Sequence, residues 1–200
     1  MKELVKVSSF GKKDKILSID QEIIRFQDQA IRIMEITEIK YAISVIQFYR
    51  FSLGNRYQIG FKTPSQQVNI ILKSYFGLQN DYFADLCNRI IAEIWEPVTD
   101  SILQANMDLL LAGGTMQVGN CQVSKEGIFI TQSHAITRQQ QFISWEDLYY
   151  EEKYDRLVLN SKSDYHIWTN LYFQDTWNID ILIAILDWVT KENGLAELQH

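Results

Sequence analysis

Proline and glycine are scarce in this chain of 200 residues, which contains two prolines and nine glycines. So few residues of the types that dominate turns and flexible linkers exclude a long linker between domains. Disorder of the whole chain is excluded as well, because 46% of the residues are hydrophobic and the net charge is only −6. Length and composition therefore predict one large folded domain or two small ones.

Long apolar runs are also missing. The longest aliphatic stretch, residues 181–186, is far shorter than the ~20 apolar residues of a membrane-spanning helix. The residues after Met1 (KELVKV) lack the apolar run of a secretory signal. Only two cysteines occur, Cys87 and Cys121, and both fall at apolar positions that favour buried free thiols. Together these absences predict a reduced, cytoplasmic protein without a transmembrane segment.

Basic residues are outnumbered, with 19 Lys and Arg against 25 Asp and Glu. This balance argues against nucleic acid as a partner, because affinity there comes mainly from neutralised phosphates. The imbalance lies in residues 101–200, which hold 6 basic and 13 acidic residues, whereas residues 1–100 hold 13 and 12. An acidic half favours either a solvated surface or a face that attracts a basic partner.

Two amphipathic helices are predicted, over residues 80–95 and 175–193. Each begins at a polar residue that can cap the free amides of the first turn, and the second ends at an Asn-Gly pair. The segments before them, residues 68–76 and 165–173, are rich in β-branched and aromatic residues and are typical of strands.

Four pairs of segments follow one another in the same order in both halves. Residues 17–24 align with 121–128, residues 34–39 with 143–148, residues 68–76 with 165–173, and Trp95 with Trp188 at the helix ends. The offsets are 104, 109, 97 and 93 residues. The pattern predicts an internal duplication of several strands followed by one helix. The first nine residues have no evident counterpart, and whether they form an added edge strand is left open.

Residues 97–112 predict a helix that connects the two copies. Pro97 suits a first helical turn, and Gly113-Gly114 suits the helix end. One face carries Val98, Ile102, Ala105 and Leu109, and we expect it to pack against both copies. Trp95 and Trp188 are expected to fill the two cores, since large aromatic residues mainly serve packing.

The second copy contains residues 123–130 (VSKEGIFI), a polar loop, residues 142–148 (FISWEDL), alternating strands and an amphipathic helix. This series resembles the pleckstrin-homology-like (PH-like) superfold of bacterial PH and GRAM-type domains. In that family a Glu-Gly turn, an Ile-x-Trp-x-x-Ile/Leu strand, a meander and a closing helix follow one another. Residues 115–192 cover the pattern nearly end to end. Residues 13–95 cover it more weakly, with Ile23 in place of the glycine and Ile36 in place of the tryptophan.

The resemblance implies a mostly β protein with α-helices (α+β): two tandem PH-like barrels, each an antiparallel meander closed by a C-terminal helix. The implied boundaries are 10–96 for the first copy, 97–114 for the helical connector and 115–194 for the second copy. A single larger antiparallel barrel or sandwich is the alternative fold.

Known catalytic and metal-binding patterns are missing from the sequence. The three histidines, His134, His166 and His200, are far apart and share no ligand spacing with either cysteine. Gly-x-Ser-x-Gly, Cys-x-x-Cys and phosphate-binding glycine loops do not occur. We therefore predict no enzyme activity, no cofactor and no metal.

The densest charge is acidic and comprises Glu146, Asp147, Glu151, Glu152 and Asp155. Paired carboxylates can serve acid–base chemistry or bind a hard cation. Successive strand residues point to opposite faces, however, so these five cannot all converge. They form either a solvated hairpin or the docking site of a basic peptide or protein, and they are the candidate partner-binding residues.

Basic residues give little support for a lipid partner. The paired basic residues with which some PH-like domains bind phosphoinositides are missing here. Lys12, Lys13 and Lys15 lie close to Glu3 and Asp14, so peripheral membrane contact is not expected.

Since the family is used mostly for binding, we predict a non-enzymatic interaction or scaffold module with a protein or peptide partner. The alternative is a small-ligand or lipid carrier, or an uncharacterised enzyme, that uses the mouth of a barrel.

Overall fold

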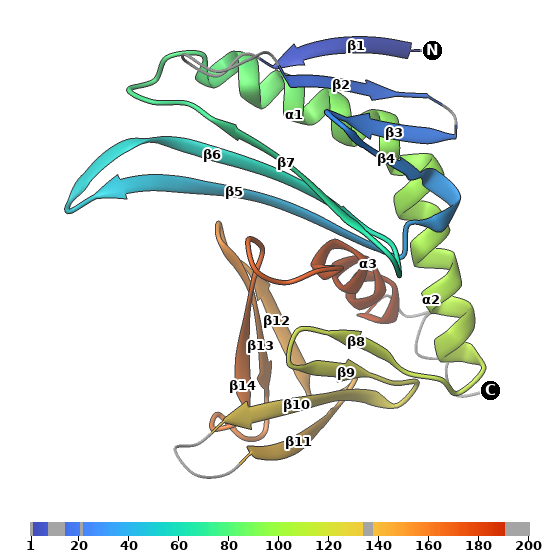
Figure 1. Ribbon diagram of the computed structural model, residues 1–200. Coiled ribbons are helices and arrows are strands. Elements are labelled where there is room, and N and C mark those ends of the chain that lie inside the picture. The colour runs from blue at the N-terminus through green and yellow to red at the C-terminus, as the bar shows by residue number, and fades with distance from the viewer. Residues whose placement is uncertain (1, 8–14, 21, 134–137, 191–200) are drawn as a thin grey trace. The chain divides into compact units, whose positions relative to one another are not determined.

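A computed structural model describes residues 2–7, 15–20, 22–133 and 138–190 (Figure 1). The chain divides into two compact units, residues 1–102 and residues 103–200, which we call the first and the second unit. The boundary falls inside helix α2 (Ser101–Leu111), within the segment 97–114 that was predicted to be a connector.

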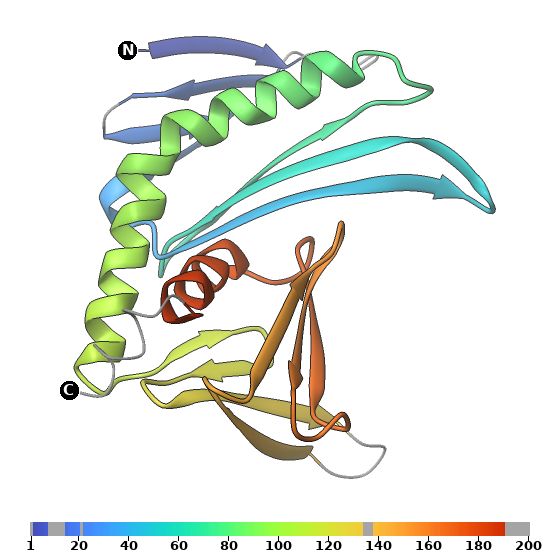
Figure 2. The same ribbon diagram turned by 180° about the vertical axis from the view of Figure 1, so that it is seen from behind.

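The first unit contains a four-stranded antiparallel meander, a three-stranded antiparallel meander and a helix. The four strands are β1 (Lys2–Val7), β2 (Lys15–Ile19), β3 (Ile23–Phe26) and β4 (Gln29–Arg32). After a 3₁₀ turn (Ile33–Glu35) come β5 (Glu38–Phe48), β6 (Phe51–Lys62), β7 (Gln67–Lys73) and α1 (Asn80–Ile94). Helix α1 lies across the four-stranded sheet in both views (Figures 1 and 2) and also contacts β6.

The second unit has the same order of elements. Its four-stranded sheet consists of β8 (Met116–Val118), β9 (Cys121–Val123), β10 (Gly127–Ser133) and β11 (Arg138–Ser144). Its three-stranded sheet consists of β12 (Leu148–Glu152), β13 (Arg156–Ser161) and β14 (Trp168–Tyr172), and α3 (Ile179–Thr190) follows. Strand β1 therefore has a counterpart, β8, which the sequence did not reveal.

Strand register repeats between the units as well. The pair Leu17–Phe26 of the first unit corresponds to Cys121–Ile130 of the second, and Ile19–Ile24 corresponds to Val123–Ile128. In the three-stranded sheets, Ile39–Phe61 corresponds to Leu148–Ser161. In the first two correspondences every residue lies 104 positions before its counterpart, as in the first pair of aligned segments. In the third, Ile39 lies 109 positions before Leu148, as in the second pair of aligned segments. Because a slip of one residue would turn every side chain to the other face, equal register in both units supports duplication of one ancestral unit.

The turn between the second and third strands is built alike in both units. The backbone N–H of Asp20 donates to the carbonyl of Ile23 (3.1 Å), and that of Ser124 donates to the carbonyl of Gly127 (2.8 Å). Each side chain accepts a hydrogen bond from the N–H two residues further on, at 3.0 Å for Asp20 Oδ1 and 3.3 Å for Ser124 Oγ. Asp and Ser favour such turns because their short side chains reach the following amides.

Both closing helices follow a residue with left-handed backbone, Gln79 and Asn178, each with φ of 59°. The buried helix residues then correspond at an offset of 99: Phe83, Leu86, Cys87 and Ile90 with Leu182, Ile185, Leu186 and Val189. The helix from residue 175 was thus placed too early, and the tryptophans are not equivalent. Trp95 is 45% exposed, so the prediction that it fills the core is wrong.

The helical segment between the copies does not have one buried face. Helix α1 continues through a π-helix (Trp95–Asp100) into α2, because Pro97 has no N–H for the regular α-helical hydrogen bond. Val98 and Ile102 are buried, whereas Ala105 and Leu109 are exposed, contrary to the prediction.

The glycine pair ends α2 as predicted. Gly113, with φ of 80°, donates its N–H to the carbonyl of Leu110, and Gly114 donates to that of Leu109. The predicted end of the last helix at residues 193–194 lies outside the described residues.

The coarse fold prediction, mostly antiparallel β with helices, is confirmed. The described strands form four separate sheets, and they do not close into the barrels that the resemblance implied. None of the described helices has the length and apolarity needed to span a membrane.

Candidate binding site

The two residues that carry the family resemblance most clearly, Gly127 and Trp145, lie together and serve folding. Trp145 is buried, and its indole Nε1 donates to the carbonyl of Lys125 at 2.8 Å. Gly127 has φ of 157° and pairs with Ser144, and a Cβ there would lie 2.2 Å from the carbonyl oxygen of Ile143. Only glycine tolerates this backbone conformation and this approach.

The five acidic residues predicted to bind a partner lie at two ends of β12. Glu146 and Asp147 immediately precede the strand, Glu151 and Glu152 end it, and Asp155 follows in the turn to β13. A rise of about 3.3 Å per residue puts these two groups roughly 15 Å apart. The structure therefore does not bring the five carboxylates into one site, and their role in docking stays a prediction.

Asp147 braces the segment that leads to β14. Its carboxylate accepts hydrogen bonds from Ser161 Oγ (2.5 Å), Ser163 Oγ (3.0 Å) and Ser163 N (2.8 Å). These bonds, that of the Ser161 hydroxyl first, lower the pKa of Asp147. The carboxylate thus has a structural role that the sequence did not indicate.

Replacing Asp147 by alanine is expected to lower the melting temperature of the second unit, since two serine hydroxyls and one amide lose their acceptor. Glu146→Ala is the matched control. The group of Glu146 that accepts a hydrogen bond from Lys162 Nζ (2.8 Å) is its backbone carbonyl, which alanine retains. Thermal unfolding followed by circular dichroism tests this. Equal melting temperatures for both variants would contradict the bracing role.

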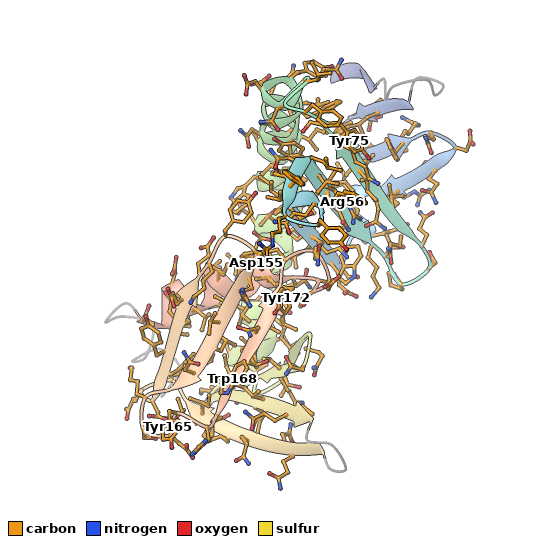
Figure 3. All side chains as sticks on the ribbon, turned by 90° about the vertical axis from the view of Figure 1, so that its left-hand side faces the viewer. Arg56, Tyr75, Asp155, Tyr165, Trp168 and Tyr172 are labelled. Carbon is orange, nitrogen blue, oxygen red and sulfur yellow. The ribbon has the colours of Figure 1, made fainter. Side chains whose placement is uncertain are left out.

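Two of the three acidic residues at the other end of β12 form ion pairs with neighbouring residues. Glu151 pairs with Lys153 (3.3 Å) and Asp155 with Arg156 (3.0 Å). Burial, and to a smaller extent the Glu152 carboxylate, raises the pKa of Asp180 in the first turn of α3 to about 7. Figure 3 shows Asp155 at the opposite end of the unit from Tyr165 and Trp168.

A change of side-chain character along β10 and β11 marks a different site. Alternation places residues 128, 130 and 132 of β10 on one face with residues 143, 141 and 139 of β11. At one end this face consists of isoleucines that are buried in the core. At the other end the same face carries Gln132, Gln139 and Gln141. The inner surface of the sheet therefore turns from apolar to carboxamide within a single pair of strands.

The glutamines open onto a cavity of about 700 Å³, which we call the amide groove. Its walls come from the β8–β9 turn, β10, β11, β14 and the segment before β14. The lining residues are Asn120, Thr131, Gln132, Gln139, Gln141, Asp164, His166, Ile167, Trp168, Thr169 and Asn170. Five of these are carboxamides, one is an acid, and there is no lysine or arginine among them.

Asn120 joins the two sheets at the floor of the groove. Its Nδ2 donates to the carbonyl of Thr131 and to Thr169 Oγ1, both at 2.9 Å. Gln132 forms a second bridge, in which its Nε2 donates to the backbone carbonyls of His166 (2.9 Å) and Trp168 (3.1 Å). These bonds fix the spacing of the walls before any ligand is present.

The outer wall provides aromatic surface. Trp168 is 49% exposed, and the ring of the neighbouring Tyr165 lies 3.9 Å from that of His166. The backbone N–H of His166 donates to Asp164 Oδ1 at 2.9 Å, which orders the turn. Carboxamides that both donate and accept hydrogen bonds, together with a half-exposed indole, suit an uncharged polar ligand or a peptide backbone.

The sequence reasoning missed this groove, although a signal was present. The run Gln139-Gln140-Gln141 was taken only as part of a polar loop after Arg138. The register of β10 with β11 is needed to see that residues 139 and 141 continue the row of buried Ile143.

The two cysteines are unsuited to act as nucleophiles. Cys87 and Cys121 are buried and free, and burial raises the pKa of their thiols to about 11 and about 12. At neutral pH both are therefore protonated thiols without nucleophilic character. Over the described ranges, histidine, cysteine and acidic residues form no group of three that could hold a metal ion.

Comparison with known proteins found no matching family model, no matching curated protein and no matching solved structure.

Proposed function

We propose that this protein is a non-enzymatic binding module built from two PH-like copies, and that its second unit binds an extended peptide along β14 in the amide groove. The repeated order of four strands, three strands and a helix supports the PH-like reading of both units. The observation behind the proposed peptide binding is that one edge of β14 has no neighbouring strand in its sheet.

Strand β14 is the last strand of its sheet, so one side of its backbone has no neighbouring strand within that sheet. The N–H of Ser161 donates to the carbonyl of Ile167, and that of Phe173 donates to Asp155, so the odd-numbered residues bond toward β13. The backbone groups of His166, Trp168 and Asn170 consequently face the groove. These are the groups that an added peptide strand would use.

The Gln132 amide already occupies part of this edge. Its two bonds reach carbonyls two residues apart, those of His166 and Trp168, which is the spacing that the N–H groups of a paired strand would meet. A side chain thus takes the place of an absent strand. An arriving peptide would exchange with this one flexible side chain and leave the ladder between β13 and β14 intact.

The other lining groups suggest which peptide fits. Carboxamides bind backbone amides whatever the side chains, and Trp168 can pack against one apolar side chain. Asp164 lies in the groove, and Asp147, which is bonded to Ser163, lies beside the same turn. This placement supports a basic residue in the peptide near the start of β14, in line with the predicted basic partner.

A small uncharged ligand is the second candidate, because the lining is rich in amides and the cavity of about 700 Å³ exceeds the volume of a simple sugar. The groove lacks the deep apolar character expected of a lipid carrier, so we favour the peptide.

The test uses a phage-displayed library of dodecapeptides selected on the full chain, followed by calorimetric titration of a synthetic selected peptide. Trp168→Ala should weaken binding about tenfold, since truncating a central aromatic contact typically costs that much or more. Asn170→Pro should abolish binding, because it removes an edge N–H without removing a bond to β13.

Gln140→Ala is the matched control, since residue 140 lies between the two groove glutamines but points to the other face of β11. It should bind like the wild type. No selected peptide, or equal affinity for the Asn170→Pro variant, would contradict strand addition. Binding of a panel of neutral monosaccharides in its place would assign the groove to the second candidate.

A further inference from the structure

Several large apolar side chains of the first unit are exposed at the ends of two loops. One loop is the tip of the β5–β6 hairpin, and the other joins β7 to α1. The exposed residues are Phe48, Tyr49, Phe51, Tyr75, Phe76, Leu78 and Tyr82, with exposed fractions from 43% to 91%. We call this surface the aromatic end.

The two loops belong to one surface. The N–H of Phe76 donates to the carbonyl of Leu53 at 2.7 Å, and that of Ser74 donates to Asn55 at 2.9 Å. Gly54 permits this contact, because a Cβ there would lie 1.9 Å from the carbonyl oxygen of Ser74. Figure 1 shows the hairpin tip and the β7–α1 loop at the same end of the first unit.

The charge of this region is opposite to that of the whole chain. From residue 39 to residue 82 there is one acidic residue, Asp81, whereas five basic residues occur: Lys40, Arg50, Arg56, Lys62 and Lys73. Lys40 is buried. Lys62 is paired with Glu38 at 2.6 Å, away from the aromatic end. Arg56 and Lys73 lie directly opposite each other on β6 and β7. Figure 3 looks onto this end and shows Arg56 near Tyr75.

Projecting loops that carry aromatic, aliphatic and cationic side chains are suited to the interface of an anionic lipid bilayer, which is partly apolar. Aromatic side chains are favoured at the interface between lipid headgroups and hydrocarbon, and nearby Arg and Lys are attracted to anionic headgroups. A protein partner would more often meet such residues within a packed pocket. Single-stranded nucleic acid would need a basic groove with stacking platforms, whereas these rings lie on loop ends.

We propose that the aromatic end inserts into the interfacial region of an anionic lipid bilayer. This goes beyond the peptide binding proposed for the second unit and concerns the other half of the chain. It also departs from the expectation, drawn from the amino-terminal lysines, that membrane contact does not occur. That expectation considered only the charged residues, whereas the structure also leaves the hydrophobic residues of these loops exposed.

Co-sedimentation with vesicles tests the proposal. One set of vesicles consists of phosphatidylcholine alone, and the other contains about 30% anionic phosphatidylglycerol as well. The wild type should bind the anionic vesicles and release them as salt is raised. Phe48→Ser/Phe51→Ser should weaken the partitioning at least tenfold. Arg50→Glu/Lys73→Glu should weaken it further, because each basic residue near such a surface contributes about fivefold.

Tyr154→Ser is the matched control, since Tyr154 is about as exposed (67%) as Phe48 and Phe51 but belongs to the second unit outside the amide groove, and it should bind like the wild type. Loss of binding in this control, or equal binding by the loop variants, would overturn the proposal. So would binding of an oligothymidylate without binding of vesicles, which would assign the surface to nucleic acid.

A site-specific probe gives an independent readout. Cys87 and Cys121 are buried, so a Tyr49→Cys variant can be labelled selectively at the hairpin tip with an environment-sensitive fluorophore. Its emission should rise and shift to shorter wavelength with anionic vesicles, whereas the same label at Tyr154→Cys, in the second unit, should not respond. Unchanged emission at position 49 would exclude insertion even if the protein sediments with vesicles.

Discussion

Substituting Gly127 by alanine is expected to lower the free energy of unfolding of the second unit strongly. The new Cβ would lie 2.2 Å from the carbonyl oxygen of Ile143 and 2.9 Å from the Cα of Ser144, and neither backbone atom can move without breaking the β10–β11 ladder. The backbone at φ of 157° is also strained for any side chain. Together these effects should cost about 3 kcal/mol or more, a large part of the stability of a small domain.

Gly113→Ala, in the same unit, separates the clash from the conformational strain. Gly113 has φ of 80°, but a Cβ there meets no atom within 4 Å, so the cost should be only about 1 kcal/mol. Urea unfolding followed by circular dichroism, with limited proteolysis of each variant, measures both costs. Similar midpoints for the two alanine variants would show that the sheet can yield at Gly127.

Much of the fold follows from local patterns that the sequence displays directly. The first aligned anchor falls in equivalent strands, because its alternation of apolar residues and its Asp or Ser turn are fixed locally. The second anchor matches only at its end, where Ile39 and Leu148 lie at the starts of β5 and β12, since Met34 lies in a 3₁₀ turn and Ile143 in β11. Segments near the helices were aligned less accurately than the first strands. Loops of unequal length separate them from the strands, and aromatic identity misled the alignment. Trp95 and Trp188 end their predicted helices alike, yet Trp95 lies in a π-helix caused by Pro97 and is exposed.

Neither candidate surface could be found from the sequence, for two different physical reasons. The amide groove depends on register, since Gln139 becomes an inner residue only when β11 is paired with β10. The aromatic end depends on exposure, since Phe48 and Phe51 look like ordinary strand residues until the hairpin is seen to extend beyond the core. The net charge of the whole chain also concealed a local feature. A net charge of −6 hides a segment of 42 residues without one carboxylate.

The second unit is expected to lose stability as pH rises from about 4 to about 7, through Asp180. Its pKa is raised to about 7, by burial first and to a smaller extent by the Glu152 carboxylate, although a hydrogen bond from its own backbone N–H acts in the opposite direction. In the unfolded chain an aspartate has a pKa of about 3.9. Below that pH the side chain is protonated in both states and nothing is lost. Between the two pKa values only the unfolded state ionises, which favours unfolding, and above about 7 the loss is complete.

Because one pKa unit corresponds to ~1.4 kcal/mol, this group alone should lower the free energy of unfolding by about 2.6 kcal/mol between pH 5 and pH 8. Asp180→Asn removes the ionisation, so its urea midpoint should exceed that of the wild type increasingly as pH rises across this interval. Glu152→Gln should move part of the way in the same direction, because it removes the nearby negative charge. Asp175→Asn, at an exposed carboxylate shortly before the helix, is the control and should leave the pH dependence unchanged. A constant difference between wild type and Asp180→Asn from pH 5 to pH 8 would mean that Asp180 ionises equally in both states, and that the start of α3 is open to water.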